Sequence, residues 1–125
     1  MNGPSPSSAA LDLPSDPVLH TMIRTFIGAC GTAWAIDDER VEDSKLAVSE
    51  LLAFADGPRI RVSLELDHAG SIRISSFGVR APEASEQDDL RLRLLGAIAS
   101  ELRWVGEAVS MVLLAETQGL NGLSP

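Results

Sequence analysis

Two alternating segments limit most strongly what this chain can fold into. In "RIRVSLEL", residues 59–66, aliphatic side chains alternate with polar ones, which is typical of a strand with one buried and one solvated face. After the turn "DHAG", the segment at 71–78 repeats the pattern, with Ile72, Ile74 and Ser76 on one face. The pair predicts an antiparallel hairpin. Its solvated face would carry Arg59, Arg61, Glu65 and Arg73.

Two helices are expected before this hairpin. The first would run from about Pro17 to Cys30 or slightly beyond, because apolar residues recur there at helical spacing and Gly31 offers a stop. The second would open at Asp37 or Asp38, either of which can cap it, and would end at "DGP". A short strand is expected ahead of both helices, at residues 9–13.

A third helix and a last strand are expected after the hairpin. The polar segment 78–88 reads as a loop, and helical spacing favours a helix from about Asp89 to Arg103. A tight turn at Trp104–Gly106 would lead into the last strand, "AVSMVLLA". The order β-α-α-β-β-α-β predicts an α+β two-layer sandwich, with a mostly antiparallel sheet and helices on one face. The inner face of the third helix would consist of Leu94, Leu95, Ile98 and Leu102.

The length of 125 residues suits one domain. Residues 1–8 consist largely of Pro, Ser, Gly and Asn and are expected to form a disordered lead-in. A single domain would occupy 9–117. Residues 118–125 would form a flexible tail.

The net charge of −8 makes the chain a poor general binder of nucleic acid and favours a basic protein surface as partner. The single cysteine, Cys30, allows no internal disulfide and is expected to be a small core residue. No apolar run approaches the ~20 residues that span a bilayer, and the N-terminus lacks a signal-peptide pattern. We therefore expect a cytoplasmic protein without membrane contact.

Common catalytic and metal motifs are absent from the sequence. There is no P-loop, no Rossmann fingerprint and no nucleophile elbow. His20 and His68 have no metal-ligand spacing, and Trp34 and Trp104 read as core or interface residues. An acidic cluster at the start of the second helix reads as a solvated helix end or, alternatively, as a docking face for a basic partner. The cluster consists of Asp37, Asp38, Glu39, Glu42 and Asp43.

Glu50 stands out within the second helix. At helical spacing it lies between Leu46 and Phe54, both apolar. It can be a rim carboxylate whose stem packs while its head reaches water. Alternatively, it is a carboxylate in an apolar cleft that serves as a catalytic base.

Three segments in order point to a family. They are "LPSDPVLHTMIRTFIGACGTAW", "DDERVEDSKLAVSELLAFA" and "RLRLLGAIASELRWVGEAVSMVLLAE". Together, over about residues 9–116, the chain resembles the GHKL (Bergerat-fold) ATPases, and more narrowly the small bacterial anti-sigma factors that are also serine kinases. The second segment resembles the family's N-box helix, "D-x-x-L-A-V-S-E-x-x-T-N-A".

The resemblance implies roles for several residues. Glu50 matches the N-box Glu, which acts as the base in these kinases. The N-box Asn, which holds Mg²⁺ on the ATP phosphates, is replaced by Phe54, whose ring offers no oxygen to a hard cation. The family's D-x-G-x-G motif reads Ser76-Phe77-Gly78-Val79-Arg80 here. Its adenine-binding Asp is thus Ser76, and its second Gly is Arg80.

The phosphate-binding segment of the family also departs from its pattern. Glycines are missing before the third helix, and three carboxylates stand where a phosphate would bind. The resemblance thus implies the family fold with a degenerate nucleotide pocket at Glu50, Phe54, Ser76 and Gly78, without metal or cofactor. The three carboxylates are Glu86, Asp88 and Asp89.

Three hypotheses follow from this comparison. The first is an anti-sigma-like binding protein that sequesters a sigma factor, or pairs with an anti-anti-sigma protein, without ATP. The second is a serine/threonine kinase that uses ATP and Mg²⁺ and phosphorylates an anti-anti-sigma partner, with Glu50 as its base. The third is an unrelated α+β domain. A homodimer is expected from the resemblance, the exposed first strand and the apolar first helix.

Overall fold

A five-stranded antiparallel sheet forms one layer of the molecule. The computed structural model describes residues 7–115. The strands lie in the order β1-β2-β3-β5-β4. Along the chain the elements are β1 Ser7–Pro14, the 3₁₀ turn η1 Pro17–Leu19, α1 His20–Ala33, α2 Asp38–Leu51, η2 Leu52–Phe54, β2 Arg59–Leu66, β3 Ile72–Phe77, α3 Glu86–Ile98, β4 Glu101–Val105 and β5 Ala108–Leu113.

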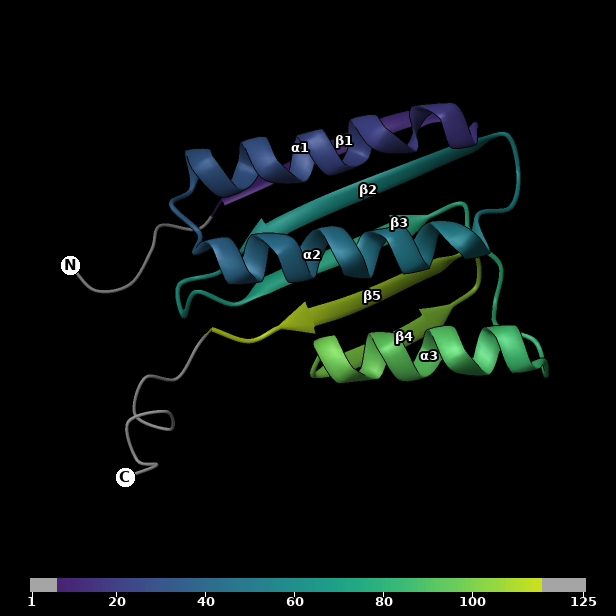
Figure 1. Cartoon of the computed structure of the whole chain (residues 1–125). Coiled ribbons are helices and arrows are strands. Elements are labelled where there is room, and N and C mark those ends of the chain that lie inside the picture. Colours follow the sequence, from purple (N-terminus) through teal and green to yellow (C-terminus); the bar gives the residue numbers. More distant parts are fainter. Residues whose placement is uncertain (1–6, 116–125) are drawn as a thin grey trace, which may run out of the picture.

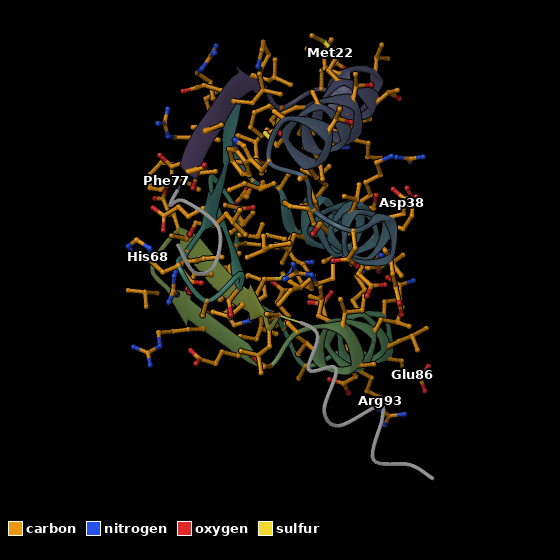
Figure 2. The ribbon with its side chains drawn as sticks, turned by 90° about the vertical axis from the view of Figure 1, so that its left-hand side faces the viewer. Met22, Asp38, His68, Phe77, Glu86 and Arg93 are labelled. Carbon is orange, nitrogen blue, oxygen red and sulfur yellow. The ribbon has the colours of Figure 1, made fainter. Side chains whose placement is uncertain are left out.

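The second layer consists of the three helices, which all lie on one face of the sheet (Figures 1 and 2). The other face of the sheet carries no helix among the described residues. The α+β two-layer architecture expected from the sequence is therefore confirmed, with one strand more than expected. No helix within residues 7–115 is long and apolar enough to cross a membrane.

The predicted hairpin is confirmed. Strands β2 and β3 pair antiparallel, with Leu64 opposite Ile74 and Val62 opposite Ser76. The inward residues of both strands are buried against the helices, and the predicted outward residues are exposed. The alternation is thus sufficient to place each side chain on the correct face, because successive residues of a strand point to opposite faces.

The first two helices pack closely where Gly31 faces Val41. The sequence predicts that Gly31 ends the first helix, but α1 continues to Ala33. A Cβ atom at position 31 would lie 2.5 Å from Cγ2 of Val41. Gly31 therefore allows close helix packing, and the prediction of a stop there is wrong. Asp37 caps α2, as expected, by accepting a hydrogen bond from the backbone N–H of Arg40 at 3.1 Å.

The third helix differs most from the prediction. It starts three residues early, at Glu86, with Ser85 as its N-cap, and ends at Ile98 instead of Arg103. Residues 101–105 form β4, which pairs with β5 across a two-residue turn that contains Gly106. The expected inner face is only partly correct, because Leu95 is buried, Leu94 is exposed and Leu102 lies in β4.

The first strand is longer than expected. It begins at Ser7 and pairs along its length with β2. The expectation of a disordered lead-in is therefore wrong for Ser7 and Ser8. Residues 1–6 and the expected tail at 118–125 lie outside the described residues, so the proposed domain limits remain predictions.

Candidate functional site

The residues singled out from the sequence lie around the end of the molecule where α2, η2 and the N-terminus of α3 meet. Glu50 is in the last turn of α2, and Phe54 ends η2. Ser76 is near the end of β3, and Gly78 follows that strand. The family resemblance assigns the nucleotide pocket to these four positions, so their actual contacts decide what this region can bind.

The backbone joins η2 to the segment after β3. The backbone N–H of Arg80 donates to the carbonyl of Phe54 at 2.8 Å, and that of Asp56 donates to the carbonyl of Gly78 at 2.8 Å. Gly78 has a φ of +94°, and a Cβ there would lie 2.3 Å from the carbonyl oxygen of Arg59. Packing and backbone conformation alone thus require glycine at this position.

Phe54 fills the space between these segments. Its side chain is fully buried. Its ring meets Trp104 of β4 edge to face, with the ring centroids 5.1 Å apart and an interplanar angle of 69°. The guanidinium carbon of Arg80 lies 5.1 Å from the centroid of the same ring. Both contacts are attractive, because the edge of an aromatic ring and a cation are each drawn to a ring face.

Asp88 holds Arg80 in place. The guanidinium of Arg80 donates to both carboxylate oxygens of Asp88, at 2.9 Å and 3.3 Å, and the backbone N–H of Glu83 adds a third hydrogen bond at 2.8 Å. Asp88 is only 4% exposed. The hydrogen bond from Arg80 lowers the pKa of the Asp88 carboxyl below its usual value. We call Phe54, Arg80, Asp88 and Trp104 the internal cluster.

Glu50 is engaged by a different arginine. Its Oε1 accepts a hydrogen bond from Nη1 of Arg91 at 3.1 Å, an ion pair that connects α2 to α3. The Glu50 side chain is 18% exposed. Leu46, one turn earlier, is 48% exposed. The prediction that Glu50 lies between two buried apolar residues is therefore wrong for Leu46. Glu50 therefore lies at the rim of the helix layer with its carboxylate already paired.

Ser76 is enclosed in the core. It is 2% exposed, and its strand neighbours in the sheet are Val62 and Val109. Its hydroxyl has no hydrogen-bond partner among the described residues. The position that the resemblance assigns to adenine recognition is thus shielded from solvent.

The sequence does not reveal the pairing of Arg80 with Asp88. In the sequence, Arg80 is notable only because it stands where the family motif has its second glycine. Asp88 is notable only because its carboxylate would repel a phosphate. They are eight residues apart across an irregular segment that contains Pro82, so no helix or strand period connects them. Only the fold of this segment brings the two charges together.

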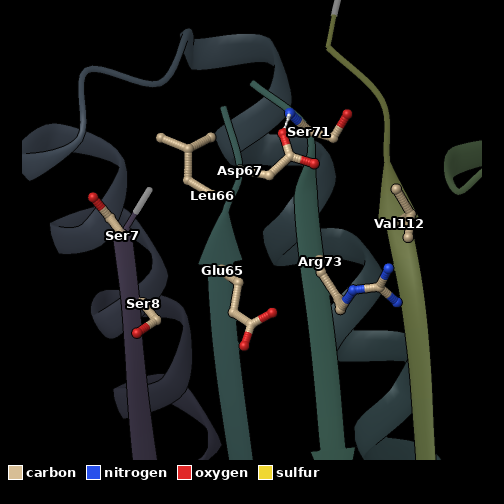
Figure 3. Close-up of a pocket in the computed structure, with 8 residues that line it drawn as sticks. All are labelled: Ser7, Ser8, Glu65, Leu66, Asp67, Ser71, Arg73 and Val112. Atoms are coloured by element: carbon tan, nitrogen blue, oxygen red, sulfur yellow. Dashed lines mark hydrogen bonds between the residues drawn. The ribbon is translucent and has the colours of Figure 1, made fainter. Parts of the chain in front are cut away.

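Four cavities of the described region lie away from Glu50, Phe54 and Ser76. One cavity of about 340 Å³ is at one end of the helix-free face of the sheet (Figure 3). Glu50, Phe54 and Ser76 line neither this cavity nor three smaller ones. Residues 7–115 also contain no group of three or more His, Cys, Asp or Glu that could hold a metal ion.

Comparison with known proteins gives a fold relative only. No protein-family model matches the chain, and no curated protein does. Among solved structures, the chain is similar to the RsbU and RsbW domains of Rv1364c from Mycobacterium tuberculosis, with a TM-score of 0.65 and 17% sequence identity. The match covers 86% of this chain and 31% of that one, so this chain spans about a third of its length. At this identity, the likeness shows that the two share a fold.

Proposed function

We propose that this chain is a regulatory binding protein of the anti-sigma type, which acts through protein–protein contacts and without ATP. Its partner would be a sigma factor or an anti-anti-sigma protein. The observation that carries the proposal is the internal cluster. Residues of the chain itself occupy the region that the family resemblance assigns to the nucleotide.

The chemistry of the cluster argues against Mg-ATP. Phe54 supplies no oxygen ligand for magnesium. Ser76 is an uncharged substitute for the adenine-binding carboxylate and is buried. Arg80 is the one cation of the cluster, and Asp88 already neutralises it.

The expected loss of affinity can be estimated. A missing charge-assisted or buried polar contact costs about 1–3 kcal/mol. Two such losses, at Phe54 and Ser76, would weaken a micromolar site by roughly two to four powers of ten. The Kd would then lie between about 0.1 and 10 mM.

Calorimetry tests this part of the proposal. We expect no saturable heat when Mg-ATP is titrated into the protein up to about a millimolar. A micromolar Kd would overturn the degenerate-site interpretation and favour the serine/threonine kinase. A matched variant, Glu50→Ala, separates the two functions. It should abolish phosphate transfer if Glu50 is a base, and should leave partner binding nearly intact if Glu50 only pairs with Arg91.

Direct binding tests the regulatory part. Purified sigma factors and anti-anti-sigma proteins from the source organism would be passed over the immobilised full chain, with and without ATP. We expect one of them to bind with the same affinity in both conditions. The proposal is wrong if none binds, or if binding requires the nucleotide.

A further inference from the structure

Two neighbouring helices leave leucines exposed on the helix layer. Leu46 of α2 is 48% exposed, and Leu90 and Leu94 of α3 are 57% and 40% exposed. They are additional to the core, because each helix also has buried aliphatic residues, such as Leu51 and Leu95. We call Leu46, Leu90 and Leu94 the leucine patch.

The ion pair between Glu50 and Arg91 shows that the three leucines lie together. It joins the last turn of α2 to the first half of α3, and the two helices run antiparallel (Figure 1). Leu46 lies one turn before Glu50 on α2. Leu94 lies about one turn after Arg91 on α3, which is the same direction along the helix pair. Leu90 is one turn from Leu94 on the same side of α3. Neighbouring exposed apolar residues of this size mark interaction surfaces more often than single ones do.

Carboxylates stand at both ends of the leucine patch. Because the helices are antiparallel, their N-terminal turns lie at opposite ends of the pair. The first turn of α2 contains Asp38 and Glu39, and that of α3 contains Glu86 and Asp89. Neither these four carboxylates nor that of Asp43 form an ion pair within residues 7–115. Figure 2 shows Asp38 and Glu86 on the side of the helix layer away from the sheet.

Few free cations balance these carboxylates. Helices α2 and α3 contain eight acidic and four basic residues. Three of the basic residues already form ion pairs, namely Arg40, Lys45 and Arg91. Arg93, the fourth, lies one turn after Asp89 and offsets part of the charge at that end. The surface is therefore apolar in the middle and acidic at both ends.

We propose that the leucine patch binds a basic amphipathic helix of a partner protein. Apolar side chains at helical spacing on that helix would cover the three leucines, as in other helix-binding surfaces. Lysines or arginines at its two ends would meet the carboxylates of the two N-terminal turns. The 14 residues of α2 are about 21 Å long, so a partner helix of about four turns reaches both ends.

Other occupants fit this surface less well. A second copy of the chain would place its own carboxylates against those of the first. The residues of the sequence outside 7–115 contain no lysine or arginine, so they lack the side chains for the basic ends. Nucleic acid would be repelled by the same carboxylates.

This inference rests on the proposed regulatory binding and adds the surface used and the chemistry of the segment that binds there. The first experiment uses a fluorescent synthetic helix of about 18 residues, with one leucine stripe and lysines at both ends. Fluorescence anisotropy with the full unmodified chain at low salt should show saturable binding that weakens as salt is added. The same peptide with glutamates in place of the lysines should not bind.

Substitutions in the chain locate the site. The double variant Leu46→Gln/Leu90→Gln should weaken peptide binding at least tenfold, because two half-exposed leucines lose their apolar contacts while the charge is unchanged. Met22→Gln is the matched control, since Met22 is 49% exposed but lies on α1. If circular dichroism shows that the double variant does not fold, Leu94→Gln takes its place, with an expected loss of about threefold.

The outcomes are distinct. Binding that the double variant loses and Met22→Gln retains supports the proposal. The proposal is overturned if the unmodified chain does not bind the lysine peptide, if the glutamate peptide binds equally well, or if the double variant binds as the unmodified chain does. A sigma factor or anti-anti-sigma protein that binds the unmodified chain should also bind the double variant at least tenfold more weakly. If the lysine peptide binds and none of these proteins does, the proposed function fails while the binding surface stands.

Discussion

The chain contains two pairs of arginine and phenylalanine with opposite surroundings. In the internal cluster, Arg80 lies over the ring of fully buried Phe54 and is bonded to Asp88. On the helix-free face of the sheet, Arg61 and Phe77 are cross-strand neighbours, but Phe77 is 56% exposed. Arg61 forms no ion pair within residues 7–115.

The difference lies in whether the side chains are paired and buried within the chain, as around Phe54, or left exposed to solvent, as around Phe77. Where the family resemblance places a ligand, the charges and the aromatic ring satisfy one another. On the opposite side of the sheet, similar side chains remain available to a partner. We therefore expect the two regions to differ in how much their side chains stabilise the fold, which the following substitutions test.

The largest effect is expected for Phe54→Ala. Removing a fully buried aromatic ring that packs on Trp104 and Arg80 should lower the free energy of unfolding by about 3–5 kcal/mol. Phe77→Ala should change it by less than about 0.5 kcal/mol, because that ring is mostly solvated. Urea unfolding at low protein concentration measures both. Equal effects would contradict the distinction between the two pairs.

An intermediate effect, dependent on pH, is expected for Asp88→Asn. Arg80 lowers the pKa of the Asp88 carboxyl, so the ion pair stabilises the folded state above the ordinary carboxyl pKa of about 3.9. This stabilisation is lost as the pH falls through the lowered native pKa. The variant should therefore melt at a lower temperature than the unmodified chain at pH 7, with the difference shrinking below about pH 4.

Asp89→Asn is the control for that experiment. Asp89 lies in the same first turn of α3 but is exposed. Both substitutions remove a carboxylate from the helix N-terminus, so their difference reports the contacts that only the Asp88 carboxylate makes, with Arg80 and with the backbone N–H of Glu83. Equal melting temperatures of the two variants at pH 7 would show that these contacts contribute no net stability.

The smallest effect is expected for Ser76→Ala. The Ser76 hydroxyl is buried and has no hydrogen-bond partner among the described residues, so its removal relieves an uncompensated desolvation. Stability should stay the same or rise by up to ~1 kcal/mol in thermal melts. Ser75→Ala, one residue away on the helix-free face of the sheet, should be close to neutral. A clear loss of stability for Ser76→Ala would point to a bound water or another partner.

Much of the fold follows from local patterns. The hairpin at 59–77 is predictable because a two-residue period has one structural meaning over eight residues. The end of the third helix is not. Leu94, Leu95, Ile98 and Leu102 fit a helical period, whereas Leu102 and Trp104 also fit the alternation of a strand. The backbone N–H and hydroxyl of Ser100 donate to the carbonyl of Val112, and this distant strand decides between the two patterns.

The candidate site also has features that the sequence determines and features that only distant contacts decide. The sequence by itself determines that the side chain at position 54 offers no oxygen ligand and that no glycine-rich segment precedes α3, because these are statements about which atoms exist. It also determines the alternation that separates the solvated face of the hairpin from the core. Only the tertiary structure decides that Asp88 binds Arg80 and that Glu50 binds Arg91. Both ion pairs depend on the path of an irregular segment and on helix packing, and neither has a sequence period.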